Sequence, residues 1–128
     1  MIATASLASA PRQQQHDPLV MQCIELCRAC YQSCQQTALT HCLDPANAHV
    51  EPNHFRLMAD CAQACRVAAD RMASGNGAHD ECCRTCAEVC RECAASCAAL
   101  GDMDECVALC RRCAEACAAM SGADASVS

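Results

Sequence analysis

The cysteines of this chain repeat one spacing, Cys-x3-Cys-x2-Cys-x3-Cys, in three separate stretches. Steps of 4, 3 and 4 residues at about 100° per residue keep all four side chains on one narrow face of an α-helix. A β-strand would distribute them over both of its faces. Each stretch therefore predicts a helix with a stripe of thiols where a bundle helix normally carries Leu. The three stretches are Cys23, Cys27, Cys30 and Cys34; Cys86, Cys90, Cys93 and Cys97; and Cys106, Cys110, Cys113 and Cys117.

A fourth segment has the same alternating spacing with fewer cysteines. Its stripe consists of His54, Met58, Cys61, Cys65, Ala68 and Met72. The remaining cysteines are Cys42, Cys82 and Cys83. Cys82 lies four residues before Cys86, so we expect it to join the stripe. Cys83 lies about 100° further round the helix, from where it could reach the core through the seam between helices.

Helix signals place these stripes on four elements. We expect helices over about 18–38, 52–73, 80–100 and 102–120, with Asp17 as the first N-cap and Asp102-x-x-Glu105 as a capping box for the last helix. Glycines at 75, 77 and 101 are typical of helix ends. Short connections predict an all-α, antiparallel up-down-up-down four-helix bundle over 17–121 with a cysteine-lined core. Residues 1–16 are expected to form a flexible or loosely helical arm, and 122–128 a disordered tail.

Composition narrows the possible functions. The chain has 17 Cys among 128 residues, a net charge of −6 and no Lys, Trp or long apolar run. An acidic balance without an aromatic platform argues against nucleic-acid binding, and no stretch reaches the ~18 apolar residues that span a membrane. The N-terminal residues lack the pattern of an export signal, so we expect a cytoplasmic protein with reduced thiols. The sequence contains no recognisable acid–base pair or nucleophile triad that would indicate an enzyme.

Metal binding explains so many inward thiols better than plain packing does, since Ala, Val or Leu would pack as well. A disulfide core is also disfavoured, because the chain has an odd number of cysteines, 17, and we expect a reducing compartment. Four thiolates around Zn²⁺ leave a charge of −2 at each buried site. Cu(I) at about one ion per thiolate leaves the core near neutral, so copper is favoured. The alternatives are a zinc or iron–sulfur protein with a structural or sensory role, for which about four metals would saturate the chain, and a thiol redox protein, which ranks third.

The repeated Cys-x3-Cys pairs on four helices, with few aromatics and no export signal, resemble the cytosolic branch of the bacterial copper storage proteins over about residues 17–120. The resemblance implies a lumen filled with many Cu(I) ions in a homotetramer, with a copper chaperone as a candidate donor. It assigns ligand roles to the pairs Cys23/Cys27, Cys30/Cys34, Cys61/Cys65, Cys86/Cys90, Cys93/Cys97, Cys106/Cys110 and Cys113/Cys117. Cys42, Cys82 and Cys83 fall outside those pairs.

The resemblance also implies loading through one bundle end that carries His or Met. Antiparallel topology places one group of such residues at the end where the last two helices are joined, and we expect the entrance there, with thioether and imidazole as transient Cu(I) ligands. That group is His41, Cys42, His49, His54, Met58 and Met103. The opposite end gathers His16, Met72, His79 and Met120. His49 and His79 are expected to be surface residues.

Overall fold

The computed structural model describes residues 17–40, 52–75 and 79–121, and in these ranges it contains four α-helices and no strand. The helices are α2 (Pro18–Thr40), α3 (Pro52–Ser74), α4 (Asp80–Leu100) and α5 (Asp104–Met120). The predicted arm, the predicted tail and four of the residues considered as candidate ligands lie outside the described residues. Those four are His16, His41, Cys42 and His49.

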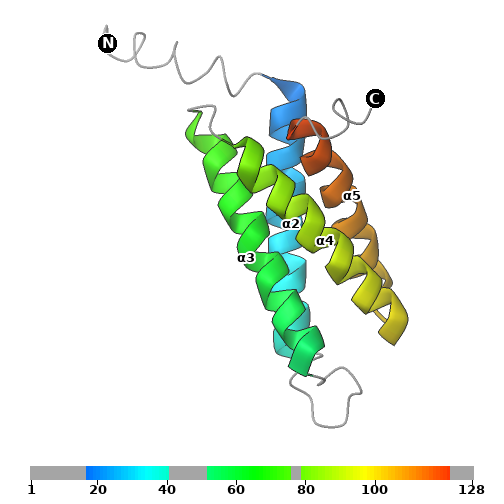
Figure 1. The fold of residues 1–128 in the computed structure, drawn as a ribbon. Coiled ribbons are helices and arrows are strands. Elements are labelled where there is room, and N and C mark those ends of the chain that lie inside the picture. The colour runs from blue at the N-terminus through cyan, green and yellow to red at the C-terminus, as the bar shows by residue number, and fades with distance from the viewer. Residues whose placement is uncertain (1–16, 41–51, 76–78, 122–128) are drawn as a thin grey trace, which may run out of the picture.

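The helices form one bundle in which each runs antiparallel to its neighbours in the chain (Figure 1). α2 packs against α3 and α5, and α4 packs against the same two helices. The expected all-α, up-down-up-down bundle is confirmed. One end of it, here called the His54 end, collects the end of α2, the start of α3, the end of α4 and the start of α5. The opposite end, called the Cys83 end, contains the start of α4.

The helix ends follow local chemistry, with one departure from the sequence prediction. The expected N-cap of α2 is confirmed, because the amide of Leu19 donates to Oδ1 of Asp17 at 3.0 Å. The C-cap of α4 is Gly101, whose φ of 84° and ψ of 169° lie in a region that is essentially restricted to glycine.

The capping box predicted at Asp102 is wrong. α5 begins two residues later, at Asp104, with Met103 as its N-cap and no side-chain cap hydrogen bond. Asp102 instead has φ 61°, because the chain reverses direction immediately after Gly101. A residue in this left-handed conformation belongs to the turn and does not cap the helix that follows.

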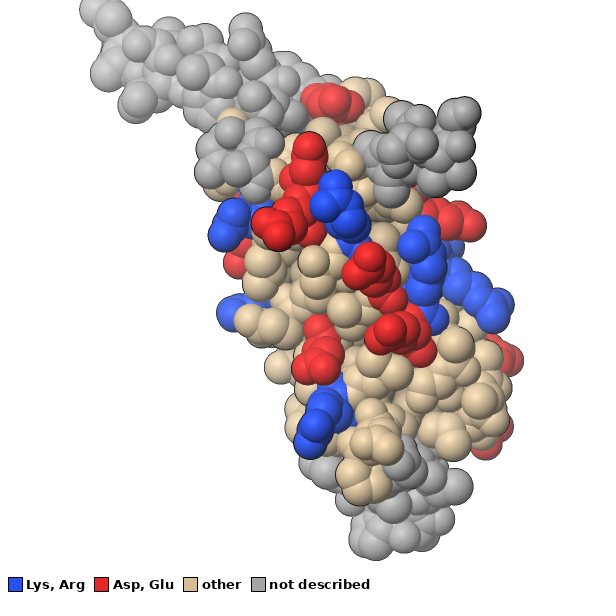
Figure 2. All heavy atoms as spheres, viewed as in Figure 1, with Lys and Arg blue, Asp and Glu red and all other residues tan. Residues whose placement is uncertain are grey.

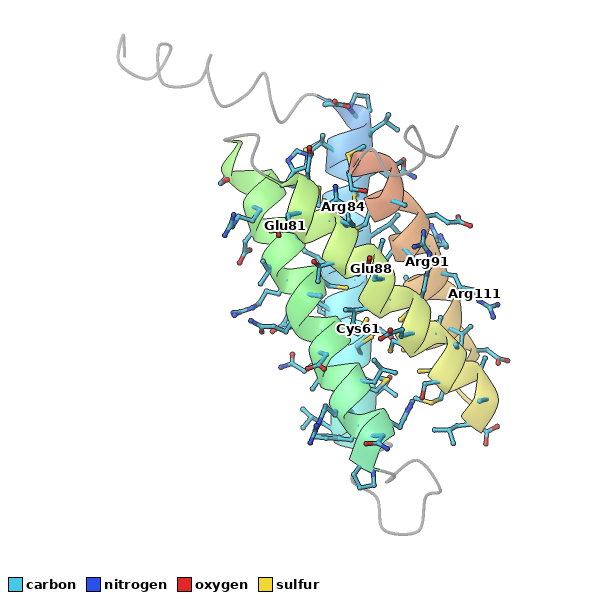
Figure 3. All side chains as sticks on the ribbon, viewed as in Figure 1. Cys61, Glu81, Arg84, Glu88, Arg91 and Arg111 are labelled. Carbon is cyan, nitrogen blue, oxygen red and sulfur yellow. The ribbon has the colours of Figure 1, made fainter. Side chains whose placement is uncertain are left out.

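Core and surface are chemically distinct. The core contains Cys, Ala and Met, with Ile24 and Val107 as its only described β-branched members. The outer face of α4 carries both acidic and basic side chains, and Figure 3 shows Arg84, Glu88 and Arg91 on it. Figure 2 shows acidic and basic side chains interspersed over this face of the molecule. No helix in the described part of the chain is long and apolar enough to cross a membrane. The core of Cys, Ala and Met places many sulfur atoms at the contacts between helices.

Candidate metal centre

All sixteen cysteines in the described ranges are free thiols, and fifteen of them are buried. The shortest contact between two described cysteine sulfurs is 3.5 Å, from Cys27 Sγ to Cys117 Sγ, whereas a disulfide bond needs about 2.05 Å. A disulfide core is therefore absent from the part of the chain that the structure describes. The bundle encloses these thiols in their reduced form.

Cys82 is the one described cysteine that is not buried, and this corrects the prediction that it joins the stripe. Cys83 is fully buried, with the thiols of Cys23 and Cys117 near it, whereas Cys82 is only half-buried. Cys83 lies seven residues before Cys90 and continues the heptad positions that face the core. Cys82 is one step out of this register. It lines a surface groove between α3 and α4 with Ala64, Val67 and Val89, so it does not join the stripe.

Fourteen of the fifteen buried thiols, all except that of Cys83, form one continuous network along the bundle axis. At the Cys83 end, Cys117 Sγ lies 3.7 Å from Cys23 Sγ. Near the His54 end, Cys97 donates to Cys106 at 4.0 Å. Between them, neighbouring sulfurs from all four helices are separated by 3.5–4.0 Å. Every thiol in this network therefore has another sulfur close enough to share a metal ion.

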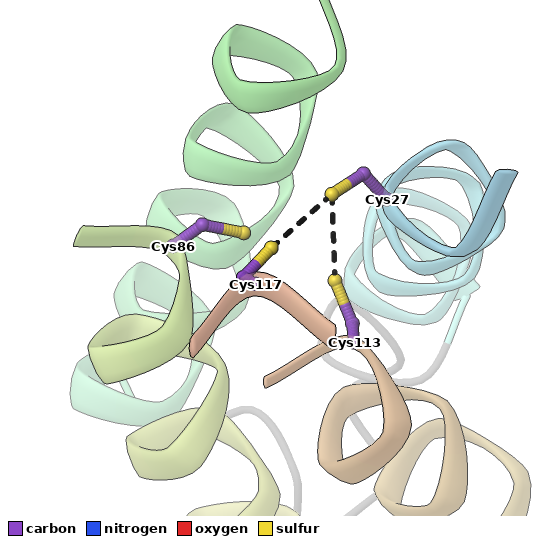
Figure 4. Close-up of side chains that lie close together, drawn as sticks. All are labelled: Cys27, Cys86, Cys113 and Cys117. Carbon is purple, nitrogen blue, oxygen red and sulfur yellow. Dashed lines mark hydrogen bonds between the residues drawn. The ribbon is translucent and has the colours of Figure 1, made fainter. Parts of the chain in front are cut away.

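Four groups of four buried sulfurs are compact enough to hold an ion, since the sulfurs of each group lie within 4.8 Å of one another. Figure 4 shows the first group, which three helices supply. We call them quartet A (Cys27, Cys86, Cys113, Cys117), quartet B (Cys30, Cys65, Cys90, Cys113), quartet C (Cys30, Cys34, Cys61, Cys110) and quartet D (Cys34, Cys93, Cys106, Cys110).

The quartets are linked through shared sulfurs. A and B share Cys113, B and C share Cys30, and C and D share both Cys34 and Cys110. They therefore form a chain of tetrahedra joined at two corners and then along one edge. Ions that fill neighbouring quartets must share thiolates, so the core is a single extended cluster site rather than four separate ones.

Hydrogen bonding and burial give neighbouring thiols unequal proton affinities. The bond with Cys106 raises the pKa of Cys34 above its ordinary range, and the bond with Cys110 lowers the pKa of Cys30. The Cys117 thiol lowers the pKa of Cys83, but the Cys23 thiol, burial and other nearby thiols outweigh it and raise that pKa to about 12. Burial disfavours a lone thiolate throughout the core, so a metal cation that bound these sulfurs would have to displace their protons.

The described non-cysteine candidates extend the network at the His54 end. Cys97 and Cys93 donate to Met58 Sδ at 3.4 Å and 3.6 Å. His54, 2% exposed, lies one turn before Met58, and its Nδ1 is 2.7 Å from Ser96 Oγ. Met103 is also buried. Sequence reasoning missed Ser96, although it flanks Cys97 on the helix end that faces the start of α3, which is where a partner for His54 would be sought.

The residues at the Cys83 end are arranged differently. Met72 is buried, Met120 is partly buried, and His79 is the N-cap residue of α4. None of the four quartets includes any of these three residues. Among the described residues, the non-cysteine side chain that accepts hydrogen bonds from cysteine thiols is that of Met58, near the His54 end.

The fold and the site together define a class: an all-α bundle whose interior clusters of buried cysteines are compatible with binding several metal ions. Within that class, the chain belongs to the copper storage protein family, whose model matches residues 3–122. It is 33% identical over 84 residues to an uncharacterized cysteine-rich protein, YhjQ, of Bacillus subtilis (strain 168), an alignment that covers 66% of this chain and 76% of YhjQ.

A solved structure has a similar fold. The crystal structure of the Nmul_A1745 protein from Nitrosospira multiformis matches with a TM-score of 0.79 and 42% sequence identity. The match covers 83% of this chain and 97% of that one.

Proposed function

We propose that this protein stores and sequesters Cu(I) in the cytoplasm, holding many ions at roughly one per cysteine and catalysing no reaction. The observation that carries the proposal is the set of fifteen buried, free thiols, fourteen of them in one continuous network, in a chain of the copper storage family. A closed interior would keep Cu(I) from redox cycling and from binding at the metal sites of other proteins.

Charge and shared ligands favour Cu(I) over divalent ions. One monovalent ion per thiolate leaves the interior formally neutral, whereas buried uncompensated charge is costly. Soft thiolate ligands select Cu(I), and an ion that accepts two or three sulfurs can occupy a chain of quartets whose corners are shared.

The His54 end is our proposed entrance. Met58 and His54 offer neutral ligands, so an arriving ion can bind there before any thiol loses its proton. Met58 contacts Cys97 and Cys93 directly, so an ion bound at Met58 could pass from there to the thiolate network. On the family resemblance we also propose a homotetramer and delivery of the ion by a copper chaperone.

Anaerobic titration of the reduced apoprotein with Cu(I) against a chelator tests the storage function. Wild type should saturate at more than ten ions, and Cys27→Ala should lower that capacity because Cys27 belongs to quartet A. The matched control is Cys82→Ala, which should keep full capacity. His54→Ala should slow loading while leaving capacity nearly intact. An unchanged capacity in Cys27→Ala would overturn the proposal.

A further inference from the structure

We propose that the outer face of α2 is an interface between two copies of this chain, in which the two α2 helices pack antiparallel about a twofold axis. Such an interface requires neither bound copper nor a tetramer, although it would supply a contact surface for the homotetramer proposed above. Three observations carry it: the low charge of this face, the aromatic groove beside it and the spacing of its exposed side chains.

The low charge of α2 separates it from the other helices. Its 23 residues include two charged side chains, Glu25 and Arg28, whereas α3, α4 and α5 have five, six and five. α2 also carries three of the four large apolar side chains that are exposed in the described ranges, namely Leu19, Met21 and Leu39. Depletion of charge, with Met and aromatic side chains enriched, is the compositional signature of an interface core.

A groove beside this face contains both aromatic side chains of the protein. The chain has one Tyr, one Phe and no Trp. Tyr31 and Phe55 line a groove of about 320 Å³ between α2 and α3, next to Leu39, and both are only partly buried. Aromatic side chains are enriched in interfaces, and this groove could receive an apolar side chain from a second copy.

The exposed side chains of α2 repeat, on the opposite face, the spacing of its cysteines. Steps of 4, 3, 4, 3 and 4 residues connect six exposed positions, which at about 100° per residue stay on one face of the helix. This is the spacing of the contact positions in a coiled coil. We call these positions the outer stripe: Met21, Glu25, Arg28, Gln32, Gln35 and Leu39.

One antiparallel register makes the outer stripe complementary to itself. With the twofold axis at the height of residue 30, Met21 of one copy lies opposite Leu39 of the second copy. In a twofold interface each contact occurs twice, since residue i contacts j and j contacts i. The two exposed apolar ends of the stripe therefore meet each other, and Met21 approaches the groove that lies next to Leu39.

The polar middle of the stripe favours this antiparallel arrangement over a parallel one. In the same register Arg28 lies opposite Gln32 of the second copy, and Glu25 lies opposite Gln35. A side-chain amide can accept a hydrogen bond from the guanidinium and donate one to the carboxylate. Parallel helices would instead place Glu25 against Glu25 and Arg28 against Arg28, and such like-charge pairs oppose association.

A charge series tests both the surface and the register, with sedimentation of the reduced apoprotein as the measurement. Leu39→Glu should raise the Kd of association by about tenfold or more, because a symmetric interface buries the unpaired charge twice. The double variant Met21→Lys/Leu39→Glu should associate at least about tenfold more tightly than Met21→Glu/Leu39→Glu, since opposite charges replace like charges. The matched control is Leu100→Glu, at the exposed leucine of α4, which should associate like wild type.

A zero-length cross-link identifies the contact itself. The chain has no Lys, so the Met21→Lys/Leu39→Glu variant carries a single side-chain amine. Its two altered positions are 18 residues apart on α2, or about 27 Å along the helix, which is too far for an amide bond within one chain. Carbodiimide should therefore join position 21 of one copy to position 39 of the other, and peptide mapping of the covalent dimer locates the link.

A monomeric wild type would overturn the inference and leave this face to a different partner. Unchanged association in the folded Leu39→Glu variant, or equal association of the two double variants, would also overturn it. A wild-type tetramer that falls to dimers in Leu39→Glu supports it. Cu(I) titration of the same preparations tests storage separately: a monomer with high copper capacity rejects only the interface, and the expected association series with copper saturating at a few ions rejects only the storage function.

Discussion

Cys82 and Cys83 are adjacent in the chain but lie in different environments. The heptad register turns Cys83 toward Cys23 and Cys117 in the core and leaves Cys82 in a surface groove. The sequence alone favoured Cys82, because a four-residue step to Cys86 fits a helix as well as a three-residue step does. Only the longer series Cys83, Cys90 and Cys97 distinguishes the two, through its constant interval of seven.

This difference predicts unequal reactivity toward an alkylating reagent. At pH 8 in the native, copper-free protein, iodoacetamide should modify Cys82 at least tenfold faster than Cys83. Cys83 is enclosed, and its pKa, raised to about 12, leaves it almost entirely as the unreactive thiol below that pH. Peptide mapping by mass spectrometry measures both rates. Equal rates in the folded protein would contradict the assigned environments, and denaturant should abolish the difference.

At the scale of helices, periodicity predicted the elements well and the turn between α4 and α5 poorly. The 4-3-4 stripes predicted both the presence of the helices and the faces that they bury, including the face of α3 that runs from His54 to Met72. The capping box failed because a two-residue shift of a helix start depends on the conformation of the turn. That conformation is set by how α4 and α5 must meet in the bundle.

The conformation of Gly101 at this turn predicts a loss of stability on substitution. Its φ of 84° and ψ of 169° cost a residue with a Cβ atom roughly 1–3 kcal/mol. No atom lies within 4 Å of a Cβ built there, so the effect is conformational rather than steric. Urea unfolding of reduced apoprotein should show Gly101→Ala to be less stable by about that amount. A change below about 0.5 kcal/mol, the usual range of a neutral surface substitution, would contradict the turn geometry.

At the scale of the whole molecule, metal loading should be coupled to proton release. Several core contacts place a thiol hydrogen between two sulfurs, as in Cys34 to Cys61 and Cys86 to Cys65. Because the interior disfavours net charge, each Cu(I) that binds should displace about one proton. Anaerobic loading near pH 7 in weak buffer, followed with a pH indicator, measures this ratio. Release of far fewer protons per ion would mean that the apoprotein already holds many thiolates.

How the quartets join could not be predicted from the sequence. Spacing within a stripe showed which thiols face inward, but not the relative height and rotation of the four helices. Those two quantities decide that Cys34 and Cys110 fall in both quartets C and D, whereas Cys61 and Cys106 each fall in one. The sequence predicted an interior of sulfur, and the folded bundle determines which sulfurs connect it.

The uneven sharing of sulfurs makes oxidative damage uneven as well. Conversion of Cys61 to a sulfinic acid would disable one quartet, whereas the same lesion at Cys110 would disable two and leave only quartets A and B intact. Oxidation would then interrupt the series of shared sulfurs, and ions held beyond the oxidised cysteine could no longer leave through the His54 end. A few well-placed lesions would cost more recoverable copper than their number implies.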